Sequence, residues 1–100
     1  MAFDQKTDFA SRRQSMAVYL CNVSTATREK LIGAMKTQEA REELRKLYLL
    51  AKAKQILGWP CQVRNLYLIQ VATTNPEQRA TLVAFMIAIV REENANIINA

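Results

Sequence analysis

Residues 41–60 read REELRKLYLLAKAKQILGWP, a run of good helix formers that ends at Gly58 and Pro60. At about 100° per residue, a helix here gathers basic side chains into one narrow line. The line and its nearest neighbours consist of Arg41, Arg45, Lys46, Tyr48 and Lys52. Such a line can contact the phosphates of a nucleic acid or the surface of an acidic protein. Three bases at helical spacing also arise easily on a solvated surface, so these residues form a candidate binding surface.

Apolar side chains lie on both sides of this basic line. One flank includes Leu44 and Leu47, and a second apolar strip follows the opposite side of the helix. A surface helix of a monomer usually has a single apolar stripe. The second strip therefore predicts either a helix packed between two neighbours of its own domain or a helix that meets another chain. We favour a homodimer, with the candidate interface residues Leu49, Ala53, Ile56 and Trp59.

The composition predicts an all-α protein. The chain has 100 residues, half of them hydrophobic, and contains two glycines and two prolines. Few glycines and prolines favour long regular elements with few turns, and the remaining residues are rich in helix formers. We therefore expect a single small domain over residues 1–100, a helical bundle of four to five helices that forms a dimer. The termini, residues 1–6 and 95–100, are expected to fray.

Capping signals divide the chain into helices over about 7–23, 24–36, 37–57 and 76–94. Ser24 or Thr25 can cap the second of these helices. Thr37 can cap the third, unless it marks a kink in one longer helix. Gly58 predicts a left-handed cap at the end of the third helix, and Pro60 prevents its continuation.

The segment 61–74, CQVRNLYLIQVATT, is ambiguous. Its β-branched and aromatic residues favour a strand. The spacing of Val63, Leu66 and Tyr67 also fits a helix that begins at Pro60. A lone strand would find no partner in this chain, so we predict a helix.

The last predicted helix has the clearest start signal, because Asn75 can cap it and Pro76 suits its first position. Residues 82–90 of this helix are apolar on nearly every side. Such a helix should be the central buried helix of the domain or be covered by a second subunit. The apolar run over residues 80–90 is too short to cross a bilayer, so no membrane association is expected.

The chemistry of most enzymes is missing from this sequence. The chain has no histidine, no glycine-rich phosphate loop and no nucleophile motif. Cys21 and Cys61 are too few and too far apart for a zinc site or a disulfide framework. We expect both to be small buried hydrophobes in a reducing compartment. The sequence predicts no catalytic residue, no metal and no cofactor.

The net charge of +5 favours an acidic partner. Our first hypothesis is a non-enzymatic adaptor, inhibitor or regulator that binds a protein partner through a helical surface. The alternative is a nucleic-acid-binding protein that contacts the phosphate backbone through Arg41, Arg45 and Lys52. No basic and apolar N-terminal leader precedes the first helix, so we expect a cytoplasmic protein.

Overall fold

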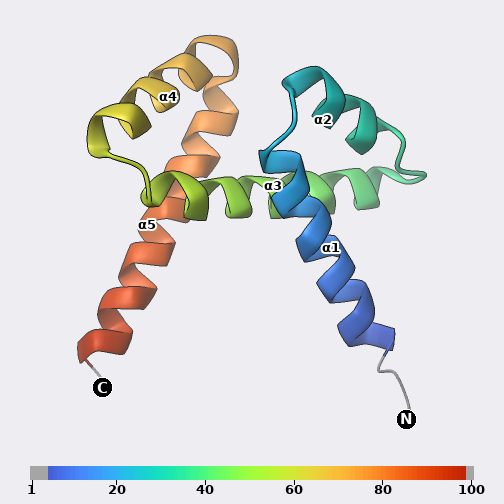
Figure 1. The fold of residues 1–100 in the computed structure, drawn as a ribbon, viewed down its shortest axis with the longest axis horizontal. Coiled ribbons are helices and arrows are strands. Elements are labelled where there is room, and N and C mark those ends of the chain that lie inside the picture. The colour runs from blue at the N-terminus through green and yellow to red at the C-terminus, as the bar shows by residue number, and fades with distance from the viewer. Residues whose placement is uncertain (1–4, 99–100) are drawn as a thin grey trace. The chain divides into compact units, whose positions relative to one another are not determined.

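The computed structural model describes the backbone of residues 5–98 and the side chains of residues 12–97. Over this range the chain forms α-helices and no strand (Figure 1). The helices are α1 (Gln5–Cys21), α2 (Thr25–Gly33), α3 (Gln38–Leu57), α4 (Cys61–Thr74) and α5 (Pro76–Ile98). The predicted all-α class is confirmed, and so is the helical assignment of the ambiguous segment 61–74.

The helices form two compact units, Met1–Ala51 and Lys52–Ala100. The boundary lies inside α3, so this helix contributes its first part to one unit and its last turns to the other. The predicted single domain over residues 1–100 stays a prediction. Residues 95–98, which were expected to fray, lie within α5, and fraying itself also stays a prediction.

The first unit is held together by apolar packing of α1 and α2 on α3. Its core side chains are Ala17, Leu20, Ile32, Leu44, Tyr48, Leu49 and Ala51. Two ion pairs join the same helices: Arg13 with Glu43, and Arg45 Nη2 with Glu29 Oε2 at 3.1 Å. Because these pairs are about half exposed, the apolar core contributes most of the stability.

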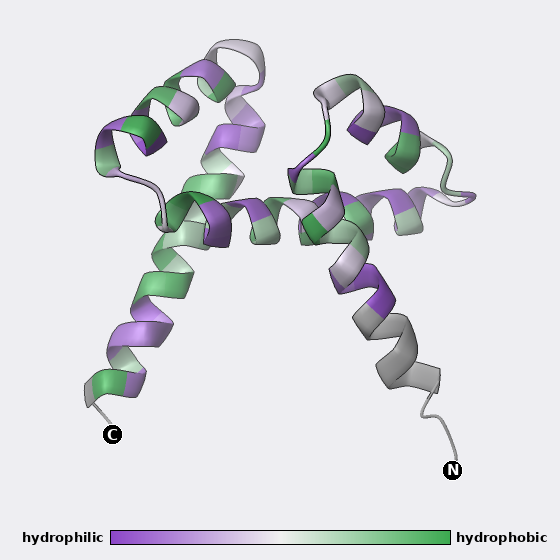
Figure 2. Ribbon diagram, viewed as in Figure 1, coloured by the Kyte–Doolittle hydropathy of each residue, from purple (hydrophilic) through white to green (hydrophobic). Residues whose placement is uncertain are grey.

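The second unit contains the helix pair α4 and α5 together with the end of α3. Figure 2 shows the hydrophobic middle of α5 in green. Of the two predicted roles of α5, the structure does not show a central buried helix, and cover by a second subunit stays a prediction. Leu82 is its only buried side chain among those described, while Ile87 and Val90 are 47% and 40% exposed. Part of the apolar run of α5 is therefore not covered by the second unit.

Three predicted helix starts are confirmed by their caps. Ser24 Oγ accepts a hydrogen bond from the Thr27 N–H at 3.2 Å. Thr37 Oγ1 accepts from the Ala40 N–H at 3.1 Å, so the chain breaks at Thr37 instead of continuing as one long helix. Asn75 Oδ1 accepts from the Gln78 N–H at 3.0 Å. Each cap satisfies an N–H group that has no partner within its helix.

The predicted left-handed cap at Gly58 is wrong. No described residue has a positive φ in the left-handed region. The Gly58 N–H instead donates to the Gln55 carbonyl and the Trp59 N–H to the Ile56 carbonyl, both at 3.1 Å. These bonds span three residues and tighten the last turn of α3, which satisfies its final carbonyls without a left-handed residue.

Candidate functional site

The predicted basic line on α3 does not form one exposed surface. Arg45 and Lys46 are exposed, but the Arg45 guanidinium pairs with Glu29 of α2. Arg41 is half-buried, and its Nη1 lies 3.5 Å from Gln38 Oε1. The exposed part of the line is therefore shorter, and its charge more compensated, than the sequence indicates.

Tyr48 belongs to the core and not to the predicted binding surface. Its side chain is only 1% exposed. The guanidinium carbon of Arg28 lies 4.4 Å from the centroid of the ring, so α2 covers it with a cation–π contact. A helical wheel of α3 alone does not show this burial, because the covering residue comes from another helix.

Lys52 is also buried, at 7% exposure. Its Nζ donates a hydrogen bond to Gln55 Oε1 at 2.7 Å. The same nitrogen lies 5.7 Å from the Trp59 ring centroid and 5.5 Å from the Tyr67 ring centroid. The two rings meet edge to face at 5.5 Å, so the aromatic pair encloses the ammonium group. Lys52 acts here as an internal contact of the second unit.

The candidate dimer residues are likewise occupied within the chain. Leu49, Ala53 and Ile56 are 8%, 0% and 0% exposed, and Trp59 is half-buried against Tyr67. The second apolar strip of α3 is thus used by neighbours in the same chain. These side chains offer little surface to a second copy.

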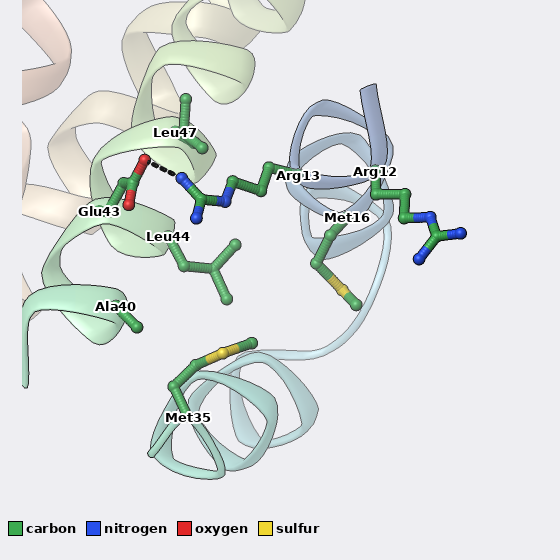
Figure 3. Close-up of a pocket in the computed structure, with 8 residues that line it drawn as sticks. All are labelled: Arg12, Arg13, Met16, Met35, Ala40, Glu43, Leu44 and Leu47. Atoms are coloured by element: carbon green, nitrogen blue, oxygen red, sulfur yellow. Dashed lines mark hydrogen bonds and ion pairs between the residues drawn. The ribbon is translucent and has the colours of Figure 1, made fainter. Parts of the chain in front are cut away.

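A different feature, which we name the methionine pocket, offers an accessible apolar surface in the first unit. Its volume is about 290 Å³, and its lining residues are Arg12, Arg13, Met16, Met35, Ala40, Glu43, Leu44 and Leu47. In Figure 3 the side chains of Met16, Met35 and Leu44 converge on this space from α1, from the segment after α2, and from α3. Methionine is flexible and polarisable, which suits a surface that adapts to a partner's side chains.

Charged side chains lie at the edge of the methionine pocket. The Arg13 guanidinium reaches across from α1 to the carboxylate of Glu43 on α3, as the dashed line in Figure 3 marks. The Arg12 guanidinium is directed away from the pocket on the outer side of α1. Because Arg13 is paired with Glu43 and the Arg12 guanidinium points outward, the charges at the edge of the pocket nearly balance, and the excess positive charge lies on the outer side of α1.

Sequence reasoning missed this pocket as a site. Met16 and Met35 fall in the predicted helices 7–23 and 24–36, where a methionine is an ordinary apolar residue. The available signal was the pair Arg12–Arg13 one turn before a methionine, which the structure shows to be half-buried. That signal becomes specific only when α2 ends at Gly33 and Met35 turns toward α3.

The prediction that both cysteines are buried is wrong for Cys61. Its side chain is exposed, whereas Cys21 is half-buried with its Sγ 3.9 Å from the Tyr48 carbonyl oxygen. Cys61 is exposed because it occupies the first position of α4 directly after Pro60. The two cysteines are not joined in a disulfide.

Within residues 12–97, no cluster of three potential ligands could hold a metal ion. None of the described helices has the length and hydrophobicity needed to cross a bilayer. The chain matches no protein-family model, no curated protein and no solved structure. Its function must therefore be argued from the residues themselves.

Proposed function

We propose that this chain is a non-enzymatic interaction protein that binds an amphipathic, acidic segment of a protein partner in the methionine pocket. The observation that carries the proposal is the convergence of Met16, Met35 and Leu44 on an accessible space of about 290 Å³. An apolar anchor of the partner would displace water from this surface, which is the main source of affinity at protein interfaces.

The charge distribution supports an acidic partner. Residues 1–51 contain nine Lys and Arg and six Asp and Glu. Arg12 and Arg13 both line the pocket, and Arg13 is paired with Glu43, so the excess of positive charge lies around the pocket and not inside it. Rim charges mainly raise the association rate and select against basic partners. The proposal keeps the cytoplasmic location, since cysteines that are not joined in a disulfide fit a reducing compartment.

The proposal includes a homodimer, as the excess of apolar surface on α5 also suggests. Ile87 and Val90 stay exposed in a helix whose middle carries no charge between Leu82 and Val90. A chain of this size gains stability from burying such surface against another subunit.

The protein-binding proposal is tested with peptides selected from a random library on the wild-type protein. We expect enriched peptides to combine apolar residues at helical spacing with Asp or Glu. Met35→Lys should weaken their binding at least about tenfold, because the new ammonium group must be desolvated in the pocket. The matched control is Lys36→Met, which changes an exposed neighbour outside the pocket. Equal binding by wild type and Met35→Lys would reject the methionine pocket.

The nucleic-acid alternative is tested by a separate binding titration. Labelled duplex DNA and duplex RNA are titrated with the protein at low and at physiological salt. Because Arg45 is paired and Lys52 is buried, we expect only weak binding that is lost near physiological salt. Micromolar binding at physiological salt that Arg45→Glu and Lys46→Glu abolish would replace the protein-binding proposal with the alternative.

A further inference from the structure

The exposed face of α4 is apolar, although it points to solvent in the single chain. Val63, Leu66 and Ile69 are 49%, 68% and 64% exposed. At about 100° per residue they share one side of the helix with three neutral polar residues. This face, which we name the α4 face, consists of Gln62, Val63, Leu66, Ile69, Gln70 and Thr73, all of them exposed.

The α4 face carries no charge. The one charged residue of α4 is Arg64, which lies on the opposite side of the helix and is half-buried. Its Nη2 lies 3.5 Å from Cys61 Sγ at the start of the same helix. A solvent-facing helix surface normally carries its charges outward and its apolar residues inward. In α4 the apolar residues face outward and the charged residue is half-buried, which is the arrangement of a helix that another chain covers.

The second unit is short of buried apolar side chains. No residue of α4 is buried. Among its described residues, the unit buries the apolar side chains of Ala53, Ile56 and Leu82. A unit of this size needs further apolar burial to be stable, and oligomerisation is a common source of it.

We propose that the α4 face binds the α4 face of a second copy of this chain. A symmetric dimer places the same surface on both sides, so a charged face would repel itself and a neutral face does not. The chain has a net charge of +5, so two copies repel one another through their charged surfaces. A neutral face avoids this repulsion. An acidic partner of the kind proposed for the methionine pocket would find no cation on the α4 face.

The surface beside the α4 face offers a place for the side chains of the second copy. A shallow depression lies between α4 and the start of α5, and Ile69 and Thr73 belong to both the α4 face and the depression. The other residues that line the depression are Asn65, Leu68, Ala72, Pro76 and Arg79. A protruding leucine of the second copy can therefore pack into a recess instead of against a flat surface.

This inference rests on the homodimer of the proposed function and gives it a surface. The test is sedimentation velocity of the full chain over a range of concentrations, for wild type, Leu66→Glu and Val18→Glu. Val18 is 50% exposed on α1 and serves as the matched control for adding a carboxylate to an exposed aliphatic position. We expect wild type and Val18→Glu to dimerise with the same Kd. Leu66→Glu should raise that Kd by about 100-fold, because the substitution enters a symmetric interface twice.

A second measurement separates a lost interface from a lost fold. Far-UV circular dichroism should show equal helicity for Leu66→Glu and wild type, and a mixture of Leu66→Glu with Leu66→Lys should regain dimers through opposite charges. A wild type that stays monomeric up to about 1 mM would reject the homodimer itself. A dimer that Leu66→Glu leaves intact would reject the α4 face alone. Peptide binding in the methionine pocket does not depend on the α4 face. The protein-binding proposal and the dimer proposal can therefore be rejected independently of one another.

Discussion

The ammonium nitrogen of Lys52 lies 5.5 Å from the centroid of the Tyr67 ring, which links the last turns of α3 to α4 within the second unit. A residue that appears in the sequence as part of a basic binding line is thus an internal contact. Its alkyl stem is buried, and its charge faces aromatic rings instead of solvent.

Substitutions of Lys52 should separate the loss of its charge from the loss of its packing. We expect Lys52→Met to change the free energy of unfolding by less than about 1 kcal/mol, because a buried cation can be replaced by an apolar chain of similar length. Lys52→Glu should lower it by about 3 kcal/mol, since it buries a carboxylate against two rings. Urea denaturation followed by circular dichroism measures both. Equal stability of Lys52→Glu and wild type would mean that this site is open to solvent.

Tyr48 is expected to be a stability residue. Tyr48→Ala removes a ring that is 1% exposed, and we expect a loss of about 3–5 kcal/mol in the free energy of unfolding. The control is Tyr19→Ala, whose ring is 53% exposed and whose loss should cost about 0.5 kcal/mol. The same denaturation experiment compares the two, and similar costs would contradict the packing of α2 on α3 over Tyr48.

The cap of α5 gives a local prediction. Asn75→Ala removes the acceptor of the Gln78 N–H and should cost about 1 kcal/mol. Asn75→Asp keeps a side-chain oxygen at the cap and should stay within about 0.5 kcal/mol of wild type. Thermal denaturation of wild type and the two variants checks this order of stability. Equal stability of Asn75→Ala and Asn75→Asp would contradict the cap.

Gly58 is expected to tolerate a side chain. Its φ is not positive, and an added Cβ would approach the Gln55 carbonyl oxygen at 3.4 Å, an ordinary contact. Gly58→Ala should therefore raise the free energy of unfolding by about 0.5 kcal/mol, because alanine has less backbone freedom in the unfolded chain. A loss of stability, measured by urea denaturation, would point to a left-handed cap.

The two thiols should react at different rates. Cys61 is exposed, whereas Cys21, the last residue of α1, is half-buried against Tyr48 of α3. In a native thiol-labelling experiment, we expect Cys61 to react at least about tenfold faster than Cys21. Cys61→Ser should remove the fast phase and leave the slow one. A single phase with both cysteines present would contradict the difference in burial.

Features that depend on residues close together in the chain were predictable from the sequence. Helical periodicity and the shortage of glycine and proline predicted the all-α class, and the caps at Ser24, Thr37 and Asn75 lie where short polar side chains precede helix formers. A cap is formed within three residues of the chain, so its signal is local. The local signals of segment 61–74 were ambiguous, and its helix was predicted because a lone strand would find no partner in this chain.

Tertiary structure alone decided which faces of these helices are covered. Tyr48 is buried because Arg28 of α2 lies over it, and Lys52 is buried because Trp59 and Tyr67 enclose its ammonium group. The methionine pocket exists because Met16 and Met35, nineteen positions apart, meet beside Leu44. A wheel gives the direction of a side chain around its own helix, whereas its burial depends on distant residues that pack there.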